Sequence, residues 1–553
     1  MSFYQSVSPV LISRFSEREE TVRLEVWQTY TKLLELTRIY GDSGSAPTPG
    51  SVREGGSSGA TSTLKRKRGG SVGASTSMAA VNGGAAPMDV DEVTPVALLR
   101  SETPLIARNI TKQLATKSVV VRQAGFALLH SLLDVLFGGL DDYLGALVPR
   151  IEAGLSVTDT GVSGTGTALK IEVLAFMTAL FESHSITILQ PTLGRLVPQL
   201  VKAAGDKFNK VAADALVTSA ALVRVMRPIP RAADVAALGA GAVVPLPTQL
   251  TGEIGKIYEV VVARLSATTT DQEVREGAIA CLGDLLVHVG DALQHEFARS
   301  LELLRESMRR EVTRVAAVRT AGRVAQSPVC AGHPALQPWA LETLAEVAPL
   351  LRQSNRAVRA EAFACLPPLL HVVGAGLTPE AAQAVLAAVQ PFLTGDDLQA
   401  VPMALGVVRA LLVVHPALAG SATFANDVLP AMYALTRAPG VQGIVLDGLI
   451  QLFVTLVRAG AAPVPILDAL SGPAMAADAS QAKGKGTATT VKTSHATASR
   501  CIGAIVREKP ELADQVANGL VGQLGNAKSS PGATTFSLLT LGEIGRFACV
   551  WAR

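Results

Sequence analysis

Aromatic residues are scarce in this chain of 553 residues, because only 4% are Phe, Trp or Tyr although 48% are hydrophobic. Sheet-rich proteins carry more aromatic side chains, whereas closely packed helices favour small aliphatic ones. The composition therefore predicts an all-α chain.

A charge excess is also lacking, since 49 Lys and Arg against 46 Asp and Glu give a formal net charge of +3. This balance predicts no direct binding of nucleic acid or of a membrane surface.

Cysteine is rare as well, and no two cysteines stand at a short spacing. The five are Cys281, Cys330, Cys365, Cys501 and Cys549. Three lie in apolar helical stripes, so we expect reduced core residues of an intracellular protein. The opening Met1–Gln5 lacks the basic flank and apolar run of a secretory signal. The most apolar stretch, 401–420, contains Arg409 and prolines, so we expect a buried helix pair there rather than a membrane span.

Patterns typical of catalysis or metal binding are missing. The eight histidines are widely separated, and no His-Glu-x-x-His or Cys-x-x-Cys motif occurs. Residues 483–487 resemble a phosphate-binding loop only superficially, because a Gly follows the Lys. His371 follows Cys365 by six residues, but Pro367 and Pro368 between them are expected to break the helix and prevent a nucleophile–base pair. We predict no catalytic, cofactor or metal site, and no enzyme.

A short pattern does return along the chain. A polar residue is followed three positions later by a Val-Arg pair and then by apolar residues at helical spacing. Four copies begin at Glu19, Ser118, Asp271 and Asn355. Weaker echoes occur near 209, 312, 400 and 442. A repeat of about forty residues that contains a pair of helices is typical of a helical solenoid.

The spacing of the pattern has a physical cause. Ser, Asp or Asn accepts a hydrogen bond from an unpaired amide in the first turn and so marks the start of a helix. Apolar residues at +3, +7 and +11 then form one stripe, which only a neighbouring helix can bury. We expect the repeated arginines to pair with a polar residue of the adjacent turn; the alternative is a ligand-binding row. The predicted fold is an all-α HEAT-repeat (armadillo-type) α-solenoid, a curved superhelix with disordered insertions.

Shifts in composition divide the chain into ordered and low-complexity parts. We predict a first HEAT-like helical unit (1–40), a disordered Gly/Ser-rich linker (41–94), HEAT repeats (95–230), a flexible connection (231–248), further HEAT repeats (249–471), a low-complexity insertion (472–498) and a terminal HEAT-like unit (499–553). Neither end shows the polar outer face of a capping repeat, so we expect the chain to be part of a longer array.

The linker holds a cluster of basic residues: Lys65, Arg66, Lys67 and Arg68. Four adjacent positive charges in a flexible segment fit the requirements of a nuclear import receptor. A solvated linker without that role is the alternative. The first interpretation predicts a protein of both cytoplasm and nucleus.

Longer strings in the helical units resemble one known family. They are residues 15–24, 205–228, 271–291, 311–314 and 538–545. These strings are similar to repeats of the cullin-associated, neddylation-dissociated proteins, also described as TATA-binding-protein-interacting proteins. The resemblance is to the middle part of that family's HEAT-repeat array, without its first and last repeats.

The resemblance implies a non-catalytic scaffold that binds unneddylated cullin–RING ubiquitin ligases and promotes exchange of their substrate receptors. The implied partners are a cullin and its RING subunit, and substrate-receptor adaptors would compete for the same cullin. Such a scaffold regulates SCF complex assembly and protein ubiquitination. The resemblance assigns no partner-binding residue in this chain.

Two other functions stay open. A karyopherin-like nuclear transport receptor is built from the same helix pairs, but the chain contains no long acidic run of the kind expected for its loop. Alternatively, the array is the solenoid arm of a larger enzyme, a kinase or ubiquitin ligase, whose catalytic domain follows Arg553. Further sequence downstream would decide between the scaffold and the enzyme arm.

Overall fold

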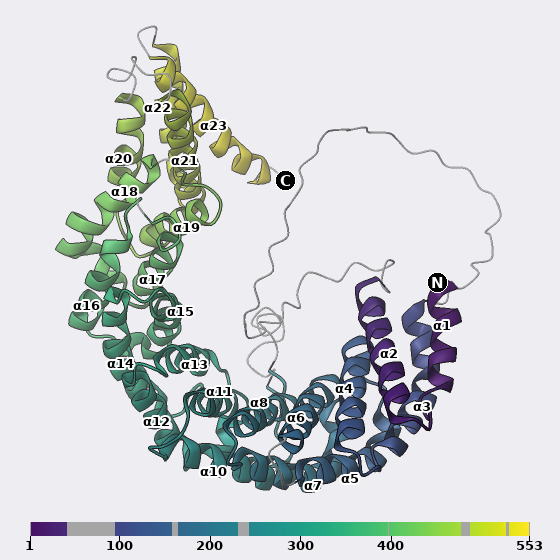
Figure 1. The fold of residues 1–553 in the computed structure, drawn as a ribbon. Coiled ribbons are helices and arrows are strands. Elements are labelled where there is room, and N and C mark those ends of the chain that lie inside the picture. Colours follow the sequence, from purple (N-terminus) through teal and green to yellow (C-terminus); the bar gives the residue numbers. More distant parts are fainter. Residues whose placement is uncertain are drawn as a thin grey trace. The chain divides into compact units, whose positions relative to one another are not determined.

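A computed structural model describes residues 2–40, 94–157, 164–229, 243–395, 397–438, 440–476, 487–526 and 530–551. Within these ranges every regular element is a helix and no strand occurs (Figure 1). The all-α fold class is confirmed. The chain divides into two compact units, Met1–Thr192 and Leu193–Arg553, which we call unit 1 and unit 2 and describe separately.

Unit 1 is built from three helix pairs and the start of a further helix. The pairs are α1 (Ser2–Ser13) with α2 (Glu20–Tyr40), α3 (Pro95–Gln113) with α4 (Val119–Leu136), and α5 (Leu144–Leu155) with α6 (Thr165–Ser183). The second helices of the pairs pack side by side in the order α2, α4, α6, and the first helices form the other layer. Helix α7 (Ile186–Ala204) spans the boundary between the units.

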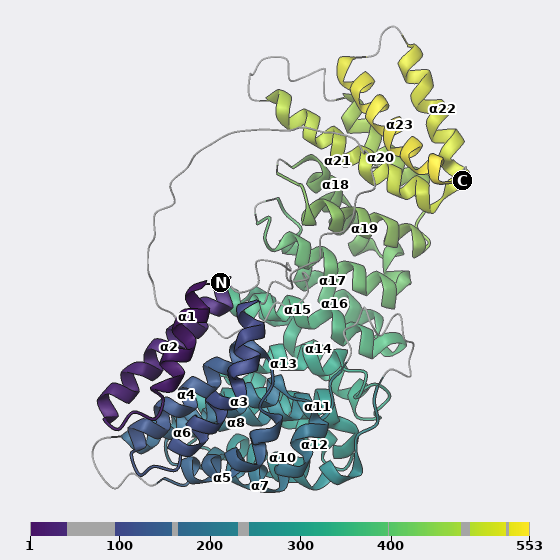
Figure 2. The same ribbon diagram turned by 90° about the vertical axis from the view of Figure 1, so that its right-hand side faces the viewer.

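Unit 2 continues the same plan. Its second helices are α8 (Asn209–Met226), α11 (Gln272–Val289), α13 (Arg314–Gln326), α15 (Arg356–Val373), α17 (Val401–Val414), α19 (Ile444–Arg458), α21 (Thr487–Glu508) and α23 (Pro531–Trp551). Its first helices from α10 onward are α10 (Thr251–Ser266), α12 (Phe297–Arg309), α14 (Leu336–Val347), α16 (Pro379–Val389), α18 (Leu429–Arg437), α20 (Pro463–Ala476) and α22 (Ala513–Gly525). Each second helix contacts the next one, and from α11 onward each also contacts its own first helix (Figure 2). Two layers of paired helices stacked in chain order form an α-solenoid.

The helix starts follow the capping chemistry of the repeated pattern. The Ser118 hydroxyl accepts from the Val121 amide at 3.3 Å, and the Asp271 carboxylate accepts from the Glu273 amide at 2.9 Å. Asn355 likewise caps α15. Behind each cap the predicted stripe is buried, because the valine at +3 is at most 2% exposed in these three copies. The local signals therefore fix where these second helices begin and which side they bury.

The copy that begins at Glu19 departs from the predicted register. Val22 is 42% exposed, whereas Arg23, Trp27 and Tyr30 are buried. The buried stripe of α2 thus begins at +4 and +8 instead of +3 and +7, whereas Tyr30 at +11 is buried as predicted. Two large aromatic rings take the core positions, and they bury far more apolar area than a valine.

Pro367 and Pro368 do not break helix α15, which runs from Arg356 to Val373 through both of them. That prediction was wrong: although two backbone hydrogen bonds are lost, packing against α13, α14 and α17 holds the helix. Cys365 and His371 are nevertheless kept apart, for a reason other than a break in the helix. Six residues of helix turn the side chain by about 240°, so Cys365 is buried while His371 is exposed.

The end of the predicted insertion 472–498 also needs correction. Helix α21 begins at Thr487, and its residues His495, Thr497 and Ala498 are buried. Small and polar side chains resemble a linker in composition, but here they pack in a helical core. Residues 41–93, which include the predicted basic cluster, lie outside the described residues.

Two helical segments, Val119–Leu136 and Arg356–Gly376, are long and apolar enough to cross a membrane. Each belongs to a second helix that packs between two others of its own unit, and about half of each segment is buried inside the fold. Their composition is therefore explained by packing between neighbouring helices. The apolar stretch 401–420 forms the partly buried helix α17 and a short 3-10 helix, Pro416–Gly420, of which only Leu418 is buried, so the predicted helix pair is present only in its first member.

Candidate partner-binding surface

Two arginines of the repeated pattern, Arg275 and Arg359, bind inside their own helix pair. The Arg275 guanidinium donates from Nη2 to the Ala267 carbonyl at 2.9 Å, and Arg359 donates from Nη1 to the Gln353 carbonyl at 3.2 Å. In both cases the acceptor lies at the end of the first helix or just after it. We predicted a polar partner in the adjacent turn, and the partner is the backbone itself, because the last carbonyls of a helix lack intrahelical donors. Arg275 and Arg359 are therefore engaged within their own repeats rather than in a ligand-binding row.

A buried carboxylate joins three consecutive second helices. Asp284 of α11, whose side chain is 3% exposed, accepts from Arg224 of α8 at 2.8 Å and from Arg323 of α13. The side chains of the two arginines are 38% and 41% exposed. Asp284 therefore holds neighbouring repeats together while the arginines reach the surface. Sequence reasoning missed this contact, although an Asp among Leu282, Gly283 and Leu285 is the signal that could have revealed it.

Other ion pairs repeat this arrangement along unit 2. Arg319 of α13 donates to Glu361 of α15 at 2.6 and 2.9 Å. Arg458 of α19 binds both carboxylate oxygens of Glu508 on α21 at 2.6 and 2.8 Å. The Arg458 hydrogen bond lowers the pKa of Glu508, so the pair stays ionised at neutral pH. The charges on the second helices thus tie repeats to one another.

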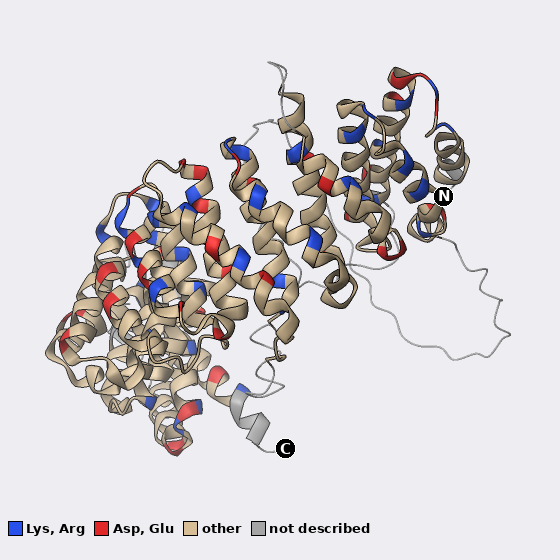
Figure 3. Ribbon diagram, turned by 90° about the horizontal axis from the view of Figure 1, so that it is seen from below, with Lys and Arg blue, Asp and Glu red and all other residues tan. Residues whose placement is uncertain are grey.

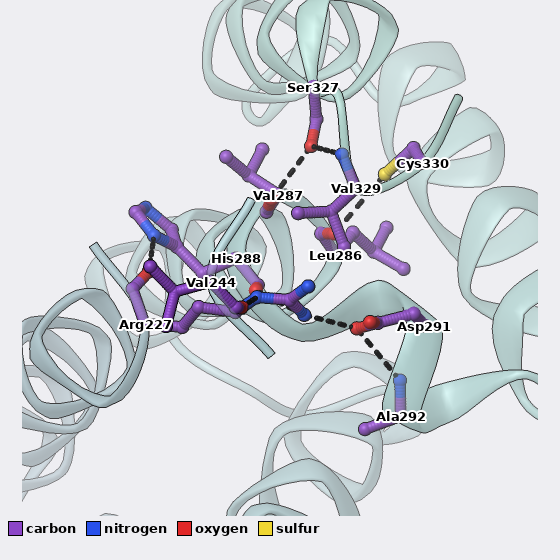
Figure 4. A network of polar contacts seen from close by, with 10 residues as sticks. All are labelled: Arg227, Val244, Leu286, Val287, His288, Asp291, Ala292, Ser327, Val329 and Cys330. Carbon is purple, nitrogen blue, oxygen red and sulfur yellow. Dashed lines mark hydrogen bonds and ion pairs between the residues drawn. The ribbon is translucent and has the colours of Figure 1, made fainter. Parts of the chain in front are cut away.

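Figure 4 shows a polar network that connects α8 to α11. The Arg227 guanidinium, 6% exposed, donates to Asp291 at 2.6 Å and to the Val244 carbonyl at 2.8 Å. The His288 ring nitrogen Nδ1 lies 2.8 Å from the Arg227 carbonyl, and burial lowers the pKa of His288. A neutral ring with its hydrogen on Nδ1 donates to that carbonyl. The network fixes the end of α8 against α11 and the residues that follow it.

The cysteines whose side chains the structure describes are buried free thiols: Cys281, Cys330, Cys365 and Cys501. Burial raises the pKa of all four, to about 12 for Cys330 and Cys501. A thiol of that pKa is a poor nucleophile at neutral pH, because the thiolate is the reactive form. The prediction of reduced core residues is confirmed for these four, and the side chain of Cys549 lies outside the described residues.

No group of three or more His, Cys, Asp or Glu side chains that could hold a metal ion occurs in the part of the chain that the structure describes. The predicted basic cluster, Lys65 to Arg68, is not among the described residues and stays a prediction. Unit 2 instead offers a long exposed surface. The outward side of its second helices, which we call the second-helix face, exposes Val217, Arg319, Met403, Val413 and Ile444.

Charges of both signs are interspersed over the helices (Figure 3). Such a surface produces no single strong field, and it favours a partner that makes many separate contacts. These features define the class of protein: an α-solenoid whose second helices are tied together by ion pairs and expose a long face.

Comparisons of the sequence identify its relatives. A family model described as CAND1-like, TPR repeats matches residues 138–282. Cullin-associated NEDD8-dissociated protein 1 of Drosophila melanogaster is 28% identical over 557 residues, which cover 98% of this chain and 39% of that protein. The Arabidopsis thaliana protein of the same name is 30% identical over 455 residues, which cover 82% of this chain and 32% of that protein. Mouse Cullin-associated NEDD8-dissociated protein 2 is 28% identical, with 99% of this chain and 39% of that protein covered.

The chain is thus a relative of the cullin-associated NEDD8-dissociated proteins along nearly its whole length, and the resemblance found in the repeats is confirmed. It spans between 32% and 39% of the length of these three relatives.

Solved structures agree on the architecture. Kap121p in its complex with Pho4p matches 82% of this chain and 46% of its own with a TM-score of 0.52 at 11% identity. Kap121p bound to the SUMO protease Ulp1p gives a TM-score of 0.51 at 12% identity, over 82% of this chain and 45% of that one. At this identity the likeness shows the fold alone, and it confirms the helical solenoid.

Proposed function

We propose that this chain is a non-catalytic scaffold that binds a cullin in its unneddylated form and regulates assembly of cullin–RING ubiquitin ligases. The observation that carries the proposal is the similarity over 98% of the chain to a protein named for its association with cullins. The fold supports it, because stacked helix pairs provide an extended surface suited to a long polypeptide partner.

We place the cullin on the second-helix face of unit 2. In this layer, the charges that tie neighbouring repeats together are already paired, as in Arg319–Glu361, while Val217, Met403 and Val413 remain exposed. Exposed apolar side chains spread among fixed charges suit an interface of many modest contacts. Ion pairs between repeats hold these side chains in place before the partner arrives, which reduces the entropic cost of binding.

Substrate-receptor exchange follows if the scaffold and the receptor adaptor each weaken the other's binding to the same cullin. Such negative coupling is reciprocal, so the complex that contains both is short-lived. The scaffold itself makes and breaks no bond in this scheme. We also propose that the protein acts in both cytoplasm and nucleus, with residues 65–68 as the import signal.

Co-purification tests the proposal. The chain is mixed with a cullin–RING complex that has been prepared in unmodified and in neddylated form, and retention on the immobilised chain is measured. We expect retention of the unmodified complex only. Equal retention of both forms would contradict the role of neddylation, and retention of neither would contradict cullin binding by this chain.

A further inference from the structure

A hollow of about 580 Å³ lies between first helices α14 and α16, in the layer opposite the second-helix face. Its floor is formed by Leu344, Val385 and Ala388, which are buried. Its rim carries the exposed Ala345 and Ala384. Methyl groups are too short to fill the space between two helices, so the groove stays open. We call it the α14–α16 groove.

One end of the groove carries a cation. Arg352 ends the 3-10 helix that follows α14 and is exposed. Most other arginines of unit 2 described above are held by a carboxylate or a carbonyl, but no described residue forms an ion pair or hydrogen bond with the Arg352 side chain. The groove therefore combines an apolar body with one uncompensated positive charge.

The chemistry of the lining favours a polypeptide as occupant. A small polar metabolite needs several polar groups that converge on it, and this groove offers little besides Arg352 and Thr378, whose hydroxyl already accepts from the Ala381 amide. A groove between two parallel layers of small side chains instead suits an amphipathic helix, whose apolar anchors stand three and four residues apart. An acidic residue at the end of that helix would neutralise Arg352.

We propose that the α14–α16 groove binds an amphipathic helix of a partner protein that presents large apolar side chains and a carboxylate for Arg352. The groove lies in the first-helix layer, so this second binding site is separate from the face on which we place the cullin. A scaffold with two separate faces holds two partners at once.

Fluorescence anisotropy with the full chain tests the proposal. The probe is a fluorescein-labelled amphipathic peptide of about four helical turns, with Leu and Phe anchors on one side and Glu in its last turn. A second peptide carries Lys instead of that Glu. We expect the first peptide to bind the wild-type chain, and the Lys peptide to bind at least about tenfold more weakly. The Arg352→Glu variant should reverse this preference.

A matched pair of substitutions tests the location. Ala384→Trp places an indole in the groove and should abolish binding, whereas Gln383→Trp adds the same ring at the neighbouring exposed position outside the lining and should leave binding unchanged. Equal binding by both variants, or no binding to the wild-type chain at millimolar peptide, overturns the proposal. Sedimentation that shows a wild-type dimer and an Ala384→Trp monomer also overturns it, because the occupant is then a second copy. Circular dichroism of each variant verifies that the helices are retained.

Discussion

Asp284→Asn removes the shared charge between three second helices while it keeps the shape of the side chain. Hydrogen bonds to charged groups contribute about 1.5–3 kcal/mol each to stability, and a neutral amide retains part of this. Arg224 and Arg323 are 38% and 41% exposed, so water compensates them when the carboxylate charge is lost. We therefore expect the variant to lose about 2 kcal/mol of unfolding free energy, shared between the two contacts.

Urea denaturation followed by far-UV circular dichroism measures this loss. Because Asp284 joins neighbouring repeats, the transition should broaden as well as move to lower urea, as coupling between repeats weakens. The control is Asp427→Asn, which removes a charge from an exposed side chain and should change stability by less than about 0.5 kcal/mol. A variant at Asp284 that unfolds within about 0.5 kcal/mol of the wild type, with an equally sharp transition, would refute the reasoning.

Three further predictions concern the core of unit 2. His288 is buried with a lowered pKa, so the folded state resists its protonation. The melting temperature should therefore fall as pH drops below about 6.5, the ordinary pKa of histidine, and His288→Gln should make it less dependent on pH. Gly283→Ala would place a methyl group against Thr320 of the neighbouring helix and should lower the free energy of unfolding by about 1–3 kcal/mol in the same urea assay. At Gly255 the added methyl group would contact no other residue, so Gly255→Ala should raise the free energy of unfolding, by at most about 1 kcal/mol. Val274→Asp puts an unpaired charge at a position that is 1% exposed and should cost about 3 kcal/mol or more; an unchanged melting temperature would contradict the assigned core side of α11.

The features that the sequence predicted correctly are local ones. The caps Ser118, Asp271 and Asn355 and the buried stripes behind them depend on residues within about one to three helical turns, so they are visible in the pattern itself. The same signals indicated helix pairs, and repetition of the pairs indicated the solenoid.

The features that escaped prediction depend on contacts between distant residues. Asp284 finds partners 60 and 39 residues away, and which arginine faces it is decided by the register between packed helices. The helix through Pro367 is likewise held by neighbours rather than by its own propensity. The α14–α16 groove arises from alanines on two helices that only the fold brings together.

The central claim is that the second-helix face of unit 2 is where the cullin binds. Hydrogen–deuterium exchange of the chain with and without an unneddylated cullin–RING complex tests this claim most directly. We predict slower exchange in the second helices from α8 to α19 and little change in the first helices α10, α12 and α14. Protection of the first helices alone, or identical exchange with and without the complex, would contradict it.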